Sequence, residues 1–182
     1  MIENAIIIYW SKTGNTQKVA YAVKKGLEEE DVTVEIKQVQ DAKEVDFFNY
    51  DLVCIGSPSY QWSPPEELDE YLQKKFNEYS DEVKLGASRV EGRNALIFCT
   101  YSGPHTGRKE AVPVVKYIGQ FFEHLGYKIL DEIYVLSQHH GSKKISTQGK
   151  MGDIRNLPTD ADLEQVKYDV REMISYHDEE SN

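Results

Sequence analysis

The stretch that decides the fold runs from Ile7 to Val23 and reads IIYWSKTGNTQKVAYAV. It begins inside the continuous apolar run 5–9, which is typical of a strand buried on both faces. Gly14 and Asn15 break that run, and from Val19 onwards apolar residues recur at helical spacing. The stretch therefore predicts a strand, a short polar loop and an amphipathic helix in succession.

The loop inside this stretch has the composition of an anion-binding site. Ser11, Thr13 and Thr16 place three hydroxyl groups within six residues, and Gly14 allows the backbone to approach a ligand closely. The first N–H groups of a helix have no intrahelical partner and lie at the positive end of its dipole. We therefore expect the loop to bind a phosphomonoester. The alternative is a helix cap in a polar turn, for which one hydroxyl would suffice.

Other phosphate-binding patterns are missing from the sequence. Neither the Walker pattern, which ends in Gly-Lys and a hydroxyl residue, nor the pattern GxGxxG occurs. A phosphatase of similar topology would need an arginine six positions after a cysteine. Tyr60 stands there after Cys54, and His105 stands there after Cys99.

The rest of the chain alternates between strand and helix patterns. Further strands are predicted at 32–36, 52–55, 94–100 and 127–136, and helices near 64–76, 114–125 and 163–173, with another short helix in the gap 38–50. Short buried strands that alternate with amphipathic helices are typical of a parallel sheet covered on both faces. Ligands of such sheets bind beyond the carboxyl ends of the strands. The loops 10–16, 57–65 and 100–108 are therefore predicted to form one site.

The length of 182 residues fits one domain, 1–182, with a C-terminal extension from about residue 137. Residues 137–159 have little periodicity, and a segment of that length is seldom idle in a compact domain. We expect an ordered strap beside the site or at a homodimer contact, and a mobile loop is the alternative. The helix that follows should be capped near Thr159 or Asp160.

Charge and composition limit the partners. The chain has 21 Lys and Arg against 31 Asp and Glu, a formal charge of −10, which argues against nucleic acid and anionic membranes as partners. This negative charge could attract a basic partner protein, or it could serve only to keep the protein in solution. The acidic run 28–31 is typical of a solvent-exposed helix end. No apolar run approaches the roughly 20 residues of a membrane helix, and no secretory signal is visible, so a cytoplasmic location is expected.

Cysteine and histidine give no support for a metal or dithiol centre. Cys54 and Cys99 lie inside apolar runs and are expected to be buried thiols, and no CxxC occurs. His139 and His140 are adjacent and have neither a carboxylate nor a cysteine beside them. We therefore predict no metal site and assign no catalytic residue.

The stretch from Ile7 to Val23 resembles the phosphate-loop signature of the flavodoxin-like family, and the order of elements resembles that family over about residues 4–136. The resemblance implies a three-layer α/β sandwich, a five-stranded parallel sheet in the order 2-1-3-4-5 with helices on both faces, and bound FMN. By the family motif, the 5′-phosphate would be held by Ser11, Thr13, Asn15 and Thr16, together with the amide of Gly14, and Lys12 is also assigned to cofactor binding.

The loops 57–65 and 100–108 more loosely resemble those with which this family and its quinone reductases hold the flavin ring. The residues assigned to the ring are Ser57, Pro58, Ser59, Tyr60, Gln61 and Trp62 in the first loop and Thr100, Tyr101, Ser102, Gly103, His105 and Gly107 in the second. Stacking on the ring is expected from Tyr60, Trp62 or Tyr101, and Trp10 is a further candidate. His105 would donate to the flavin or relay a proton, unless it is only an exposed loop histidine.

Three functions remain open at this point. The first is an FMN-binding electron carrier with a protein redox partner, and FAD is not expected because no second glycine-rich turn is present for a pyrophosphate. The second is an oxidoreductase that passes hydride from NAD(P)H through FMN to a quinone or similar small acceptor. The loop 57–65 has no glycine, unlike many one-electron family members, and the chain continues past the usual end; both points favour this second function. The third is an interaction module without catalysis.

Overall fold

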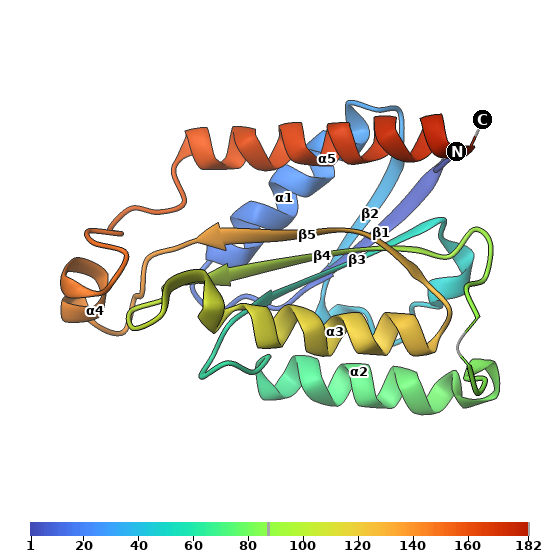
Figure 1. The fold of residues 1–182 in the computed structure, drawn as a ribbon, viewed down its shortest axis with the longest axis horizontal. Helices are drawn as coiled ribbons and strands as arrows, with labels where there is room; N and C mark the ends of the chain where they lie inside the picture. Colours follow the sequence, from blue (N-terminus) through green and yellow to red (C-terminus); the bar gives the residue numbers. More distant parts are fainter. Residues whose placement is uncertain (87, 182) are drawn as a thin grey trace.

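The computed structural model describes residues 1–86 and 88–181 and contains a five-stranded parallel sheet (Figure 1). Its strands are β1 (Asn4–Tyr9), β2 (Thr33–Gln38), β3 (Leu52–Pro58), β4 (Asn94–Tyr101) and β5 (Lys128–Leu136). Their order in the sheet is β2-β1-β3-β4-β5, so the predicted fold class and strand order are confirmed.

Helices cover both faces of this sheet, with α1 and α5 on one face and α2 and α3 on the other (Figure 1). The helices are α1 (Asn15–Glu28), α2 (Glu66–Glu78), α3 (Val112–His124), α4 (Lys143–Gln148) and α5 (Asp160–Ser181). Short 3-10 helices also occur: η1 (Val39–Asp41), η2 (Phe47–Asn49), η3 (Ser80–Glu82) and η4 (Gly107–Glu110). None of the helices in the described residues is both long and apolar enough to cross a membrane.

The sheet separates two apolar cores because successive side chains of a strand point to opposite faces. In β1, Ile6 and Ile8 pack with α2 and α3, whereas Ile7 packs with α1 and α5. The central strands β1, β3 and β4 are almost wholly buried, while the edge strand β2 is half exposed. Continuous apolar runs therefore mark the central strands, and alternation marks the edge.

Two segments depart from the sequence-based expectation. The gap 38–50 holds two one-turn helices, η1 and η2, instead of one short helix. The segment 137–159, in which the sequence shows little periodicity, contains the short helix α4 within the expected strap. The cap of α5 is as predicted, because the Thr159 hydroxyl accepts from the Asp162 amide and the Asp162 carboxylate accepts from the Thr159 amide.

The acidic run 28–31 is not simply a solvated helix end. Glu29 forms an ion pair with Lys167 at 2.8 Å, and Glu30 accepts from the guanidinium of Arg171 at 2.9 Å. Both cations belong to α5, which packs so tightly on α1 that a Cβ on Gly26 would lie 2.9 Å from the Lys167 carbonyl oxygen. The last helix is therefore a fixed part of this layer.

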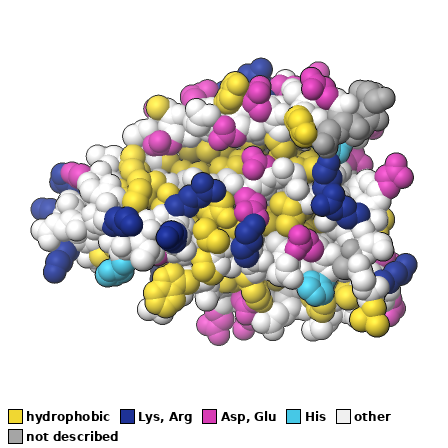
Figure 2. Space-filling model, in the orientation of Figure 1, with side chains coloured by type: hydrophobic (Ala, Val, Ile, Leu, Met, Phe, Trp, Pro, Cys, Tyr) yellow, Lys and Arg dark blue, Asp and Glu magenta, His cyan; other side chains and the backbone are white. Residues whose placement is uncertain are grey.

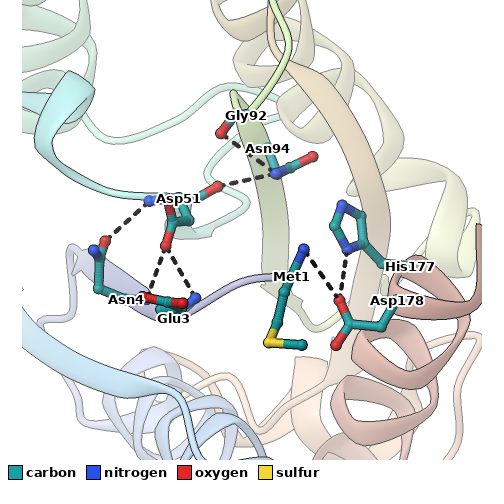
Figure 3. Close-up of polar contacts among 8 residues, drawn as sticks. All are labelled: Met1, Glu3, Asn4, Asp51, Gly92, Asn94, His177 and Asp178. Atoms are coloured by element: carbon teal, nitrogen blue, oxygen red, sulfur yellow. Dashed lines mark hydrogen bonds and ion pairs between the residues drawn. The ribbon is translucent and has the colours of Figure 1, made fainter. Parts of the chain in front are cut away.

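Polar contacts tie the amino ends of the strands together (Figure 3). The Asp51 carboxylate accepts from the amides of Glu3 and Asn4, and the Asn4 side-chain oxygen accepts from the Asp51 amide in return. The Asn94 side chain donates to the Asp51 carbonyl, and the Met1 ammonium lies 3.7 Å from the Asp178 carboxylate. This end of the sheet is closed by structural contacts, and the opposite end carries the site.

Gly56 in β3 is fixed by close packing, and its replacement by Ala is expected to destabilise the protein by about 1–3 kcal/mol. A Cβ at this position would overlap the ring of Phe98, which is fully buried in β4. Urea unfolding measures the effect. The double variant Gly56→Ala/Phe98→Leu should recover part of the lost stability because Leu lacks the ring that overlaps. Equal stability of Gly56→Ala and the parent would contradict this account of the packing.

Candidate functional site

A cavity of about 970 Å³ lies at the carboxyl ends of β1, β3, β4 and β5. The predicted site residues that line it are Ser11, Lys12, Thr13, Asn15, Thr16, Pro58, Ser59, Tyr60, Gln61, Trp62, Thr100, Tyr101, Ser102 and His105. The three predicted loops thus meet in one place. This size is within the usual range for cofactor and drug-sized ligands, about 300–1,000 Å³.

Four predicted residues do not line the cavity and instead shape the loops behind it. Ser57 is fully buried and donates to the Pro58 carbonyl. Gly103 and Gly107 are buried and joined by a hydrogen bond from the Gly107 amide to the Gly103 carbonyl. Gly14 is the N-cap of α1, with φ of +92°, a conformation that glycine adopts without strain.

Ser11 organises the turn that leads into α1. Its Oγ accepts from the amides of Gly14 and Gln17, at 3.2 and 3.3 Å. Both acceptor positions of this oxygen are therefore used, and its O–H remains to donate. The first turn of α1 contains no acidic residue, whereas that of α2 contains three, Glu66, Glu67 and Asp69. The N-terminus of α1 is therefore suited to an anion, whereas that of α2 is not.

Asn15 and Thr16 are buried, and each is fixed by a partner from far along the chain. The Thr16 and Thr100 hydroxyls lie 2.9 Å apart, so that one donates to the other and the acceptor keeps its own proton for a further bond. The Asn15 side chain donates one of its two N–H groups to the Gln138 carbonyl at 3.0 Å. After these hydrogen bonds are made, Asn15 retains one N–H group and the Thr16–Thr100 pair retains one O–H group as donors.

The loop 57–65 forms a tight two-residue turn. The backbones of Tyr60 and Ser63 exchange two hydrogen bonds of 3.0 Å, and the central residues Gln61 and Trp62 have φ of +49° and +68°. Such a turn normally holds Asn-Gly, and residues with side chains in this conformation cost about 1–3 kcal/mol each. Strain of this kind concentrates at ligand sites, and the turn here directs an aromatic side chain to the cavity rim.

The aromatic residues of the cavity differ in how accessible they are. Trp62 is 61% exposed and Tyr60 is 44% exposed, whereas Tyr101 packs within the core next to the cavity. Trp10 meets Tyr60 edge to face, with ring centroids 5.6 Å apart. Burial raises the pKa of the Tyr60 and Tyr101 phenols, so both are protonated at neutral pH. Tyr60 and Trp62 are the rings most open to a ligand.

Glu110 is a cavity residue that sequence reasoning missed. Its carboxylate accepts from the amides of His105 and Thr106, at 2.7 and 2.6 Å, and its carbonyl accepts from the Ser59 hydroxyl. The residue therefore fixes the loop after β4 and joins it to the loop after β3. Sequence reasoning did not identify this role because Glu110 lies well after the end of β4 in the sequence.

The extension supplies a further cavity wall, formed by Ser137, Gln138, His139, His140, Gly141 and Ile145. His140 lies near α1, with its Nε2 3.5 Å from the Asn15 side-chain oxygen. The buried Nδ1 of His139 has no hydrogen-bond partner among the described residues. The length of the segment 137–159, from which we expected a strap beside the site or at a homodimer contact, was the signal for it in the sequence.

The two cysteines are buried in β3 and β4 and do not line the cavity. Cys54 and Cys99 are free thiols, and burial raises the pKa of both. In residues 1–86 and 88–181, no cluster of three or more His, Cys, Asp or Glu side chains is arranged to hold a metal ion.

Comparison with known sequences supports the fold. A family model described as a flavodoxin domain matches residues 6–127. A flavodoxin of Clostridium beijerinckii is 28% identical over 96 residues, which cover 52% of this chain and 62% of that protein. A flavodoxin of Maridesulfovibrio salexigens is 32% identical over 72 residues, which cover 39% of this chain and 49% of that protein. The alignments thus span 49–62% of the length of these relatives.

Solved structures share the fold at low identity. Oxidised flavodoxin 1 from Bacillus cereus has a TM-score of 0.66 at 14% identity, with 95% of this chain and 98% of that chain covered. A flavodoxin described as WrbA-like, from Agrobacterium tumefaciens, has a TM-score of 0.65 at 12% identity, with 96% of both chains covered. The coverage includes the extension, so these proteins share more than the region of the family model.

Proposed function

The chain belongs to the flavodoxin family, and on that premise we propose that it binds FMN without a covalent bond and transfers electrons through it. The observation that carries the proposal is the anion-suited N-terminus of α1, which opens into a cavity with exposed aromatic residues. When bound, FMN supplies the one- and two-electron redox chemistry. The chain supplies the phosphate contacts, the orientation of the ring and the protection from water.

The phosphate site would use donors that remain free after the structural hydrogen bonds are made. These are the hydroxyls of Ser11 and Thr13, one proton of the Thr16–Thr100 pair and the second amide N–H of Asn15. Lys12 lines the same part of the cavity and adds a positive charge. Hydrogen bonds from these groups to a phosphate dianion are charge-assisted and therefore strong. This donor set suits one terminal phosphate.

The experiment that tests the proposal is extraction and reconstitution. The purified protein is denatured, and the released flavin is identified by mass spectrometry as FMN or FAD. Apoprotein is then titrated with FMN and with riboflavin, and the protein is reduced anaerobically with dithionite while the flavin spectrum is followed. FMN binding that is much tighter than riboflavin binding supports the proposal. Extraction of FAD, or no uptake of FMN, refutes it.

A second function, reduction of a small acceptor by NAD(P)H, is favoured by the wall that residues 137–145 add to the cavity. His139 and His140 lie in this wall, and a histidine ring nitrogen that faces a cavity can donate to a substrate or accept from it. Anaerobic addition of NADPH distinguishes the two functions. Rapid bleaching of the flavin supports the reductase. A flavin that only dithionite or a protein donor reduces supports the carrier.

Replacing Trp62 or Tyr60 by Ala is expected to raise the fluorescence of bound FMN for at least one of the two variants, because a stacked aromatic ring quenches flavin emission. The same variant should lose affinity, since an aromatic pair contributes about 0.5–1.5 kcal/mol beyond the area that it buries. Tyr21→Ala, on the exposed face of α1, is the matched control. Unchanged emission in both site variants would place the stacking surface elsewhere.

A further inference from the structure

The charges of the chain are sorted between its two ends. The four segments around the cavity, 10–18, 57–65, 102–110 and 137–156, contain eight Lys and Arg but only two Asp and Glu. The rest of the chain contains 13 Lys and Arg against 29 Asp and Glu. Figure 2 shows Lys and Arg gathered at the end that carries α4, and acidic groups along the helices above and below the sheet. Although the net charge of the chain is −10, the end of the molecule that carries the cavity has an excess of positive charge.

Six exposed cations lie in the segments around the cavity, and we call them the cationic rim: Lys12, Arg108, Lys109, Lys143, Lys144 and Lys150. Lys12 lines the cavity, and Lys143 and Lys144 come directly before the lining residue Ile145. The Lys150 amide donates to the Pro104 carbonyl, which places this lysine against the loop that carries Arg108 and Lys109. The rim thus joins two loops and the extension.

Within the described part of the chain, the rim cations lack acidic partners, unlike many of the cations on the body of the molecule. All six side chains are exposed, and among the described residues none has a carboxylate within ion-pair distance. On the body of the molecule, by contrast, Lys24, Lys75, Lys116, Lys167 and Arg171 are each paired with a glutamate. Among the described residues, the rim therefore gathers six unpaired cations at the end of the molecule that carries the cavity.

An apolar centre accompanies the rim. Trp62 and Tyr60 are exposed at the cavity, and Met151, which is 37% exposed, has its sulfur 3.0 Å from the position of a Cβ on Gly107. Exposed aromatic and Met side chains surrounded by a charged, solvated border are typical of protein–protein interfaces.

We propose that the cationic rim docks the acidic face of a protein redox partner, an inference that rests on the proposed electron transfer through FMN. Of the six cations, only Lys12 lines the cavity, so the charge is spread over a surface and does not converge on a small anion. At physiological ionic strength the Debye length is about 8 Å, and a partner at the rim is therefore screened from the acidic helices farther away. The rim therefore favours an acidic partner, whereas the negative net charge of the chain would favour a basic one.

The test measures the affinity of the flavin-loaded protein, by isothermal titration calorimetry, for two probes of opposite charge. The probes are a small acidic iron–sulfur ferredoxin and basic cytochrome c. We expect the ferredoxin to bind and its Kd to rise about tenfold between 50 and 300 mM salt, because rim charges are screened by added ions. Cytochrome c should bind more weakly. Tighter binding of cytochrome c would overturn the proposal.

A pair of charge-reversal variants locates the effect. Lys143→Glu/Lys144→Glu should weaken ferredoxin binding by about tenfold, since both lysines belong to the rim. Lys25→Glu/Lys84→Glu makes the same change in net charge, at the last turn of α1 and after η3, and should leave the Kd unchanged. Equal losses in the two variants would mean that only the net charge matters and would overturn the docking site.

The outcome for the cofactor is separate. A protein that neither contains nor takes up flavin refutes the proposed function. The ferredoxin titration of that same protein still decides whether the rim binds an acidic surface, so the two failures are distinguishable.

Discussion

Replacing Thr13 and Thr16 together by Val is expected to raise the Kd for FMN by about a hundredfold or more. Each hydroxyl lost removes a hydrogen bond to a charged group, worth about 1.5–3 kcal/mol, and every 1.4 kcal/mol or so is a factor of about ten in affinity. Both residues line the cavity at the start of α1. Fluorescence titration of the apoprotein with FMN measures the change.

Riboflavin provides the internal control for this variant because it lacks the phosphate. The Kd for riboflavin should be nearly the same in the double variant and the parent. The preference of the protein for FMN over riboflavin should therefore be smaller in the double variant. Thr33→Val, at an exposed position in the edge strand β2, is the matched control for loss of a hydroxyl. A double variant that keeps the parental affinity for FMN would contradict the assignment of this loop to the phosphate.

The second large effect concerns stability. Phe47→Ala is expected to lower the free energy of unfolding by about 3–5 kcal/mol, since it leaves a cavity in a packed core. Phe47 is fully buried in η2 and contacts the rings of Tyr71, Tyr79, Phe121 and Phe122. The connection between β2 and β3 therefore anchors the layer that contains α2 and α3.

Urea unfolding at constant pH measures this loss. Tyr176→Ala, at a position that is 64% exposed in α5, is the control for removal of an aromatic ring and should change stability by less than about 0.5 kcal/mol. If Phe47→Ala were as mild as this control, the connection would not contribute to the core as described.

The sequence was sufficient for the fold because the features that specify it are local. The central strands are apolar on both faces, and each helix shows its own periodic stripe, so the order of elements follows from short windows of the chain. The loop 10–16 could be singled out as a candidate phosphate site because its hydroxyls and Gly14 are close together in the sequence. Those windows also locate the site, since parallel strands end at the same edge.

What the sequence could not predict depends on contacts between distant residues. Nothing near Glu29 signals that Lys167 pairs with it, and nothing near Glu110 signals that its carboxylate turns back to the amides of His105 and Thr106. The left-handed turn at Gln61 and Trp62 could not be predicted from the sequence for a different reason. Neither residue type favours that conformation, so tertiary contacts must hold it.

The hydrogen bond from Asn15 to the Gln138 carbonyl has a consequence for biosynthesis. It joins residues 123 positions apart, so one wall of the cavity is built from a part of the chain that leaves the ribosome long after the loop 10–16. Until that part emerges, the loop 10–16 lacks the far wall of the cavity. If the chain binds FMN as proposed, a nascent chain would lack part of the binding cavity until translation has passed β5.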